Sequence, residues 1–130
     1  MKIIDGKGMV MGRLASYVAK QAMQGEEIAV VNCSNIIITG NKKFIKEKFE
    51  ESRRRVGTRQ IGPKVSKSSE KIFKRAIRGM LSDHRRGRGK DAWRRKKCYS
   101  TIPKGLNSAE IIQLKKSNKI KSIEVKEINE

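Results

Sequence analysis

The 130-residue chain has few cysteine, histidine and aromatic residues, and each shortage excludes a class of protein. Its two cysteines, Cys33 and Cys98, lie far apart without a CxxC spacing, which excludes a structural zinc framework and gives no sign of a disulfide-rich secreted scaffold. We interpret them as buried or idle thiols in a reducing cytosol. No Asp, Glu and His residues share metal-ligand spacing, and no serine stands in a G-x-S-x-G turn. We therefore expect no metal, no cofactor and no enzyme.

Long hydrophobic runs are also missing. No apolar run approaches the ~20 residues that a membrane-spanning helix needs. Met1 and Lys2 lead directly into a strand-like segment, so we expect no signal peptide, no membrane partner and a cytoplasmic protein. At this length we expect one domain, residues 1–130, that buries roughly two-thirds of its unfolded surface.

Acidic residues are scarce, and positive charge is what the chain has in excess. It carries 32 Lys and Arg against 13 Asp and Glu, a net charge of +19. Between Arg53 and Lys104 there are 19 basic and three acidic residues, so this segment alone carries +16. Charge this concentrated repels itself unless a polyanion neutralises it. The composition therefore predicts a nucleic-acid partner bound by a basic surface over residues 53–104.

Hydrophobic periodicity predicts alternating strands and helices. Helices are expected at Arg13–Gln24, Asn41–Ser52 and Ser69–Leu81, and strands at residues 2–5, 27–32, 35–40 and 97–102. The strands at 27–32 and 35–40 are nearly all apolar and β-branched, as in strands covered on both faces. This pattern indicates an α/β layer fold around a largely parallel sheet.

The remaining segments contain fewer signals of secondary structure. Arg53–Lys67 and Arg85–Lys97 are polar, glycine-containing and basic, so we expect two long basic loops that do not order without RNA. In the C-terminal tail, residues 105–130, Asn107 and Glu110 resemble a capping box that opens a short helix through Leu114. The stretch KSIEVKEI alternates weakly and predicts an edge strand.

The glycine-rich turn in IIDGKGMVMGRLAS raises the question of a nucleotide site. Gly8 is followed by three residues before Gly12, where a dinucleotide-binding turn has two, and the second strand ends in Asn32 instead of an acidic residue. The lysine and hydroxyl of a P-loop are also missing. We interpret the turn as a strand-to-helix connection whose helix N-terminus, beside Arg13, could hold an RNA phosphate.

The helix at Ser69–Leu81 is the most informative element of the sequence. Its apolar residues hold i, i+4 spacing, and its cations fall on the remaining face. Arginine is frequent within RRR, HRRGR and WRRKK, and its planar fork suits phosphate oxygens. Scarce aromatic residues argue against a stacking platform for single strands, so structured RNA fits better.

Four stretches carry a resemblance to a known family, namely IIDGKGMVMGRLASYVAK, EIAVVNCSNIIITGNK, GPKVSKSSEKIFKRAIRGML and RGKDAWRRKKCY. In this order, from about Ile3 to Pro103, they resemble the universal ribosomal protein L13 family of the large subunit. The short N-terminus is similar to the archaeal and eukaryotic branch. The chain departs from the family at Ser82, where proline is usual, and at CYST, where a VYxG pattern is common.

The resemblance implies a three-layer α/β/α fold with a four-stranded, mainly parallel sheet. It implies a structural constituent of the large ribosomal subunit that binds ribosomal RNA, contacts neighbouring ribosomal proteins and supports assembly and translation without catalysis. Carried over by motif, the RNA-facing residues are Arg13, Lys64, Lys74, Arg75, Arg78, Arg88 and Lys90. The basic segment adds Arg53, Arg54, Arg55, Arg59, Lys67, Lys71, His84, Arg85, Arg86, Arg94, Arg95, Lys96 and Lys97. A regulatory RNA- or DNA-binding module acting outside the ribosome shares the same composition and stays open as the alternative.

Overall fold

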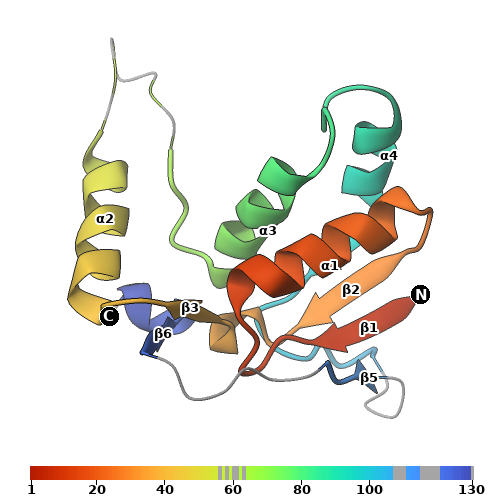
Figure 1. The fold of residues 1–130 in the computed structure, drawn as a ribbon, viewed down its shortest axis with the longest axis horizontal. Coiled ribbons are helices and arrows are strands. Elements are labelled where there is room, and N and C mark those ends of the chain that lie inside the picture. Colours follow the sequence, from red (N-terminus) through yellow and green to blue (C-terminus); the bar gives the residue numbers. More distant parts are fainter. Residues whose placement is uncertain are drawn as a thin grey trace.

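A four-stranded parallel sheet forms the centre of the molecule (Figure 1). The computed structural model describes residues 1–55, 57, 59, 62, 64–106, 111–114 and 121–129. The strand order is β4 (Lys96–Cys98), β2 (Ile28–Val31), β1 (Lys2–Asp5) and β5 (Ile111–Ile112), and every neighbouring pair is parallel. The predicted α/β class and the four-stranded parallel sheet are confirmed.

Three helices cover one face of this sheet: α1 (Met11–Met23), α3 (Ser69–Met80) and α4 (Gly87–Arg95) (Figure 1). Because side chains alternate along a strand, Ile4 and Val30 face the helices and join their apolar stripes in the main core. Their neighbours in the strands face the other way, where Tyr99 and Leu106 pack against them. These layers are consistent with the predicted three-layer α/β fold.

The second apolar run is not part of the main sheet, which corrects the expectation for residues 35–40. β3 (Ile37–Thr39) pairs antiparallel with β6 (Ser122–Glu124) in a separate two-stranded sheet, and its residues are partly exposed. The predicted C-terminal edge strand is therefore confirmed. Helix α2 (Lys42–Arg54) packs on this small sheet through Ile45 and Phe49.

Two further segments differ from expectation. The segment Arg85–Lys97, predicted as a loop, contains the nine-residue helix α4 and the start of β4. The short helix predicted to run through Leu114 is wrong at Ile111 and Ile112, which form β5 against β1. Its capping box, Asn107 and Glu110, lies outside the described residues.

The boundaries of the three predicted helices hold within two residues. α2 begins after Asn41, whose side-chain oxygen accepts a hydrogen bond from the Lys43 amide at 3.1 Å and caps the helix. In the predicted loop Arg53–Lys67, Arg53 and Arg54 are the last residues of α2. In the described part of the chain, no helix is long and apolar enough to cross a membrane.

Candidate nucleic-acid interface

Helix α3 separates its apolar and cationic residues onto opposite sides. Ile72 and Ile77 are buried against the sheet and α1. Lys71, Arg75 and Arg78 are exposed and follow one another at spacings of four and three residues. This spacing places them along one stripe of the helix, over about 10 Å of its axis. Packing of the apolar side therefore presents three cations to the solvent in a row.

Helix α4 adds a second group of cations on the same side of the sheet (Figure 1). Arg88, Lys90 and Arg94 are exposed, while Ala92 is buried against the neighbouring elements. The buried Gly89 explains how this helix is seated, since a Cβ there would overlap backbone carbonyl atoms of the preceding turn. A helix carrying so many charges is held here by two small residues that allow close packing.

The cations at the end of α2 are engaged by carboxylates. The Arg54 guanidinium lies 2.9 Å from Glu50, and the Arg55 guanidinium lies 2.8 Å from Glu51. In contrast, none of the exposed cations of α3 and α4 forms an ion pair within the described residues. A phosphate that binds Arg54 or Arg55 must therefore displace a carboxylate, whereas a phosphate that binds the exposed cations of α3 or α4 does not.

Arg53 is turned toward the protein. It is half-buried, its Nη2 donates to the Ser66 carbonyl at 3.5 Å, and its guanidinium carbon lies 5.9 Å from the centroid of the Phe49 ring. These contacts tie the end of α2 to the segment that leads into α3.

Two predicted candidates from α4 and β4 are also turned inward. Arg95 donates from Nη1 to the Ala22 carbonyl at the end of α1, at 3.0 Å. Lys96 is only 8% exposed; its Nζ lies 3.2 Å from the centroid of the Trp93 ring and donates to the Trp93 carbonyl at 3.1 Å. Burial lowers the pKa of Lys96 to about 8. Lys97, the next residue of the strand, is exposed, because successive side chains of a strand point to opposite faces.

The glycine-rich turn after β1 is used for backbone packing. The Gly6 amide donates to the Val31 carbonyl at 2.9 Å, the Gly8 amide donates to the Asn35 carbonyl at 3.1 Å, and Gly8 has a φ of 74°. The Asn32 amide nitrogen donates to the Asp5 carboxylate at 2.9 Å. These amides are bonded within the protein, so the turn does not offer them to a nucleotide, which agrees with its interpretation as a connection.

The predicted site residues divide by exposure. The exposed ones are Arg13, Arg54, Arg55, Arg59, Lys64, Lys67, Lys71, Arg75, Arg78, Arg85, Arg86, Arg88, Lys90, Arg94 and Lys97. Half-buried are Arg53, Lys74, His84 and Arg95, and Lys96 is buried. The His84 ring lies 6.1 Å from the Trp93 ring, centroid to centroid. The structure thus places the candidates of α3 and α4 on two helices that both pack on α1, apart from those at the end of α2 (Figure 1).

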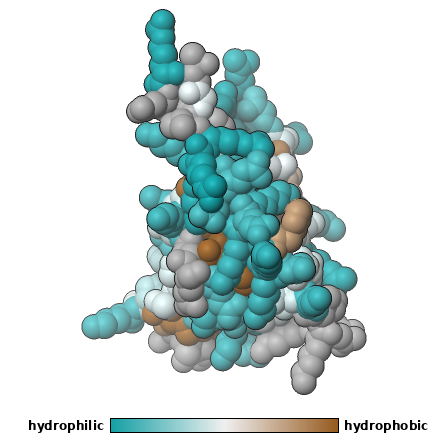
Figure 2. All heavy atoms as spheres, turned by 90° about the vertical axis from the view of Figure 1, so that its left-hand side faces the viewer, coloured by the Kyte–Doolittle hydropathy of each residue, from teal (hydrophilic) through white to brown (hydrophobic). Residues whose placement is uncertain are grey.

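Several exposed cations lie outside the predicted set. Lys42, Lys43 and Lys48 are exposed on α2, and Lys20 is exposed on α1. Seen from the side of α2, hydrophilic residues cover most of the surface (Figure 2). Lys20 and Lys43 lie opposite the apolar stripes of their helices, a signal that the sequence already contains, whereas Lys42 and Lys48 flank the stripe of α2.

Comparisons with known proteins show which family the chain resembles. The model of the family described as ribosomal protein L13 matches residues 1–105. Proteins named large ribosomal subunit protein uL13 are similar to the chain. That of Methanosphaera stadtmanae is 40% identical over 95% of this chain and 90% of the relative, and that of Thermoplasma volcanium is 45% identical over 85% and 80%. That of Methanococcus maripaludis is 38% identical over all of this chain and 96% of the relative. The chain belongs to the ribosomal protein L13 family.

Proposed function

We propose that the chain is a structural constituent of the large ribosomal subunit, binds its ribosomal RNA through phosphate contacts, and supports subunit assembly and translation without catalysis. Its relatives are named as proteins of the large ribosomal subunit, and the match covers most of the chain. Its other partners are neighbouring proteins of that subunit.

The observation that carries this proposal is the row of cations on α3. Lys71, Arg75 and Arg78 are exposed on a helix whose opposite side is buried, and none of them forms an ion pair within the described residues. A phosphate that binds there has no protein carboxylate to displace. The backbone of α3 is held by the core, so binding orders only the ends of the three side chains.

The cations of α4 extend the same surface. Arg88 and Arg94 are exposed, and α4 packs on α1 as α3 does. RNA phosphates that contact both helices would release condensed counterions, so affinity should fall steeply as salt concentration rises. Arg54 and Arg55 contribute less in this proposal, because each phosphate contact there competes with Glu50 or Glu51.

The test is a salt titration of binding to large-subunit ribosomal RNA with the triple variant Lys71→Gln, Arg75→Gln, Arg78→Gln. We expect the slope of log affinity against log salt to become shallower by about two to three units, since each lost phosphate contact removes a little under one unit. The matched control exchanges Lys43, Lys48 and Lys121 for Gln; these lysines are exposed on α2 and next to β6, and none of them forms an ion pair within the described residues.

Equal losses in the two variants would contradict the proposed interface, since they would show a response to net charge alone. Incorporation into large subunits tests the ribosomal role separately. The wild-type chain should sediment with large subunits after a high-salt wash, and a chain that binds RNA but never enters the subunit would support the regulatory alternative.

A further inference from the structure

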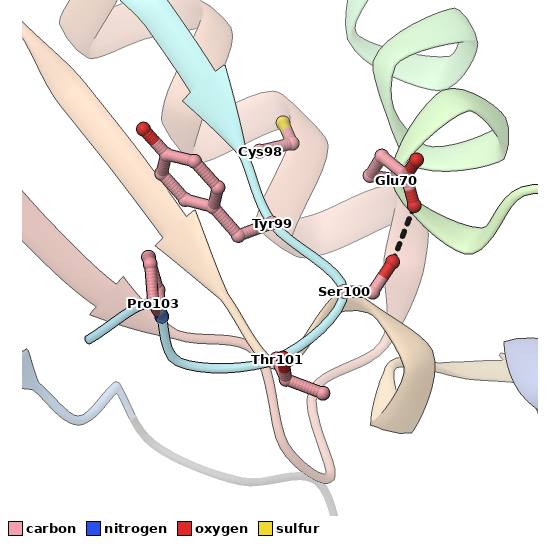
Figure 3. Close-up of a pocket in the computed structure, with 6 residues that line it drawn as sticks. All are labelled: Glu70, Cys98, Tyr99, Ser100, Thr101 and Pro103. Atoms are coloured by element: carbon pink, nitrogen blue, oxygen red, sulfur yellow. Dashed lines mark hydrogen bonds between the residues drawn. The ribbon is translucent and has the colours of Figure 1, made fainter.

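The two cysteines meet beside an open pocket at the carboxyl end of β4. The pocket has a volume of about 230 Å³. It is lined by Glu70, Cys98, Tyr99, Ser100, Thr101 and Pro103 (Figure 3). Ser100 donates a short hydrogen bond to the Glu70 carboxylate, which connects this end of β4 to the first turn of α3. Cys98 is thus a core residue that also lines a space open to small molecules.

Strand pairing places Cys33 next to Cys98. Cys98 lies opposite Val30 in the parallel register of β2 and β4, and Cys33 follows the end of β2. The Cys33 amide donates to the Tyr99 carbonyl at 3.1 Å, and the Cys33 thiol donates to the Val30 carbonyl at 3.7 Å. Both side chains belong to the same buried core, and both are free thiols. The cysteines are 65 residues apart in sequence but are brought together by the turn after β2 and the adjacent strand β4.

The surroundings distinguish the two sulfurs. Cys98 is 6% exposed and lines the pocket, whereas Cys33 is 0% exposed and does not line it. A small oxidant that enters the pocket therefore meets Cys98 first, and Cys33 lies behind it in the core.

We propose that Cys33 and Cys98 are a peroxide-reactive pair, in which Cys98 attacks the oxidant from the pocket wall and Cys33 resolves the product into a disulfide. The Cys98 thiolate attacks one oxygen of hydrogen peroxide, the O–O bond breaks, and the other oxygen leaves as hydroxide and takes up a proton. Cys98 is then a sulfenic acid. The Cys33 sulfur attacks the Cys98 sulfur, and the hydroxyl leaves with the Cys33 proton as water. Two electrons pass from the two thiols to the peroxide.

The disulfide would fasten the turn after β2 to β4 and close a loop that contains α2, α3 and α4. These elements carry most of the exposed cations described above. The oxidised chain should therefore resist unfolding better than the reduced chain, because the crosslink restricts the unfolded state. This inference concerns the thiols alone and holds whether or not the chain binds ribosomal RNA.

The experiment treats the folded, full-length chain with a small excess of hydrogen peroxide. We expect both thiols to disappear together, the intact mass to fall by two hydrogen atoms, and a peptide joining Cys33 to Cys98 to appear after digestion. Dithiothreitol should restore the original mass. Persistence of both free thiols, or crosslinks between chains only, would overturn the proposal.

The single variants separate the two roles. In Cys33→Ala, the sulfenic acid of Cys98 should persist and be captured by dimedone. In Cys98→Ala, Cys33 should react at least tenfold more slowly than Cys98 does in the first variant. Similar rates in both variants would mean that the thiols react only after unfolding. If a variant does not fold, dimedone competition in the wild-type chain gives the same distinction, since the adduct must then form on Cys98 and not on Cys33.

Discussion

Substituting the two adjacent lysines of β4 one at a time separates the energetic cost of a buried charge from the contribution of an exposed charge to RNA binding. Lys96 is buried against Trp93, whereas Lys97 is exposed. We expect Lys96→Met to stabilise the protein and leave RNA affinity unchanged. We expect Lys97→Met to leave stability unchanged and weaken RNA binding, with the salt slope reduced by about one unit.

The magnitude for Lys96 follows from its pKa. Burial lowers that pKa from 10.5 to about 8. One pKa unit corresponds to about 1.4 kcal/mol, so below pH 8 the buried ammonium costs the folded state about 3 kcal/mol. Its position over the Trp93 ring returns about 1 to 2 kcal/mol. Methionine keeps most of the apolar stem, so we expect the free energy of unfolding to rise by about 1 to 2 kcal/mol near pH 7.

The pH dependence has a defined sign. Below pH 8 the Lys96 amine is protonated in both states and the folded state carries the full cost. Between about pH 8 and 10.5 the folded protein loses this proton before the unfolded chain does, so stability rises with pH. Urea unfolding of the wild type and Lys96→Met at several pH values measures this difference, which should shrink toward pH 10.5. A less stable Lys96→Met near pH 7 would refute the reasoning, because the contact with Trp93 would then outweigh desolvation.

Four further changes follow from local geometry. Gly89→Ala should lower the free energy of unfolding by about 1 to 3 kcal/mol in urea denaturation, because the added methyl group meets backbone carbonyls. Gly79→Ala has open space around it and should raise the free energy of unfolding by about 0.5 to 1 kcal/mol in the same measurement. Asn41→Ala removes the cap of α2 and should cost about 1 kcal/mol by the same measurement; no loss would mean that water replaces the cap. Exchanging Glu50 and Glu51 for Gln removes the carboxylate partners of Arg54 and Arg55. RNA affinity measured by filter binding should then rise about twofold for each pair that is removed. Unchanged affinity would place the end of α2 outside the interface.

Long periodic segments were predictable because their signals are local. The apolar stripes of α1, α2 and α3 place each helix within two residues of its observed bounds. Helix α4 was not predictable in this way, since GRGKDAWRR has two glycines and only Ala92 and the buried Gly89 face the core. Too few apolar positions remain there to define a period, and packing on α1 makes the segment helical.

Strand partners were not predictable from the apolar runs. Residues 28–31 and 37–39 look alike in sequence, but the first run is central in the main sheet and the second pairs with β6. β5 is even shorter, and its Ile111 and Ile112 become a strand only because the edge of β1 is available for pairing. A strand's partner lies far away in sequence, so local propensity cannot identify it.

The sequence by itself determined the α/β class, the concentration of positive charge between residues 53 and 104, and, through its motifs, the ribosomal protein L13 family. Composition and periodicity carry this information without regard to partners in space. Only the tertiary structure decided which cations face the solvent. Strand register turns Lys96 inward and Lys97 outward, and packing directs Arg95 to the Ala22 carbonyl and Arg53 to the Ser66 carbonyl. Orientation depends on what each element packs against, and packing brings together residues that are distant in the chain.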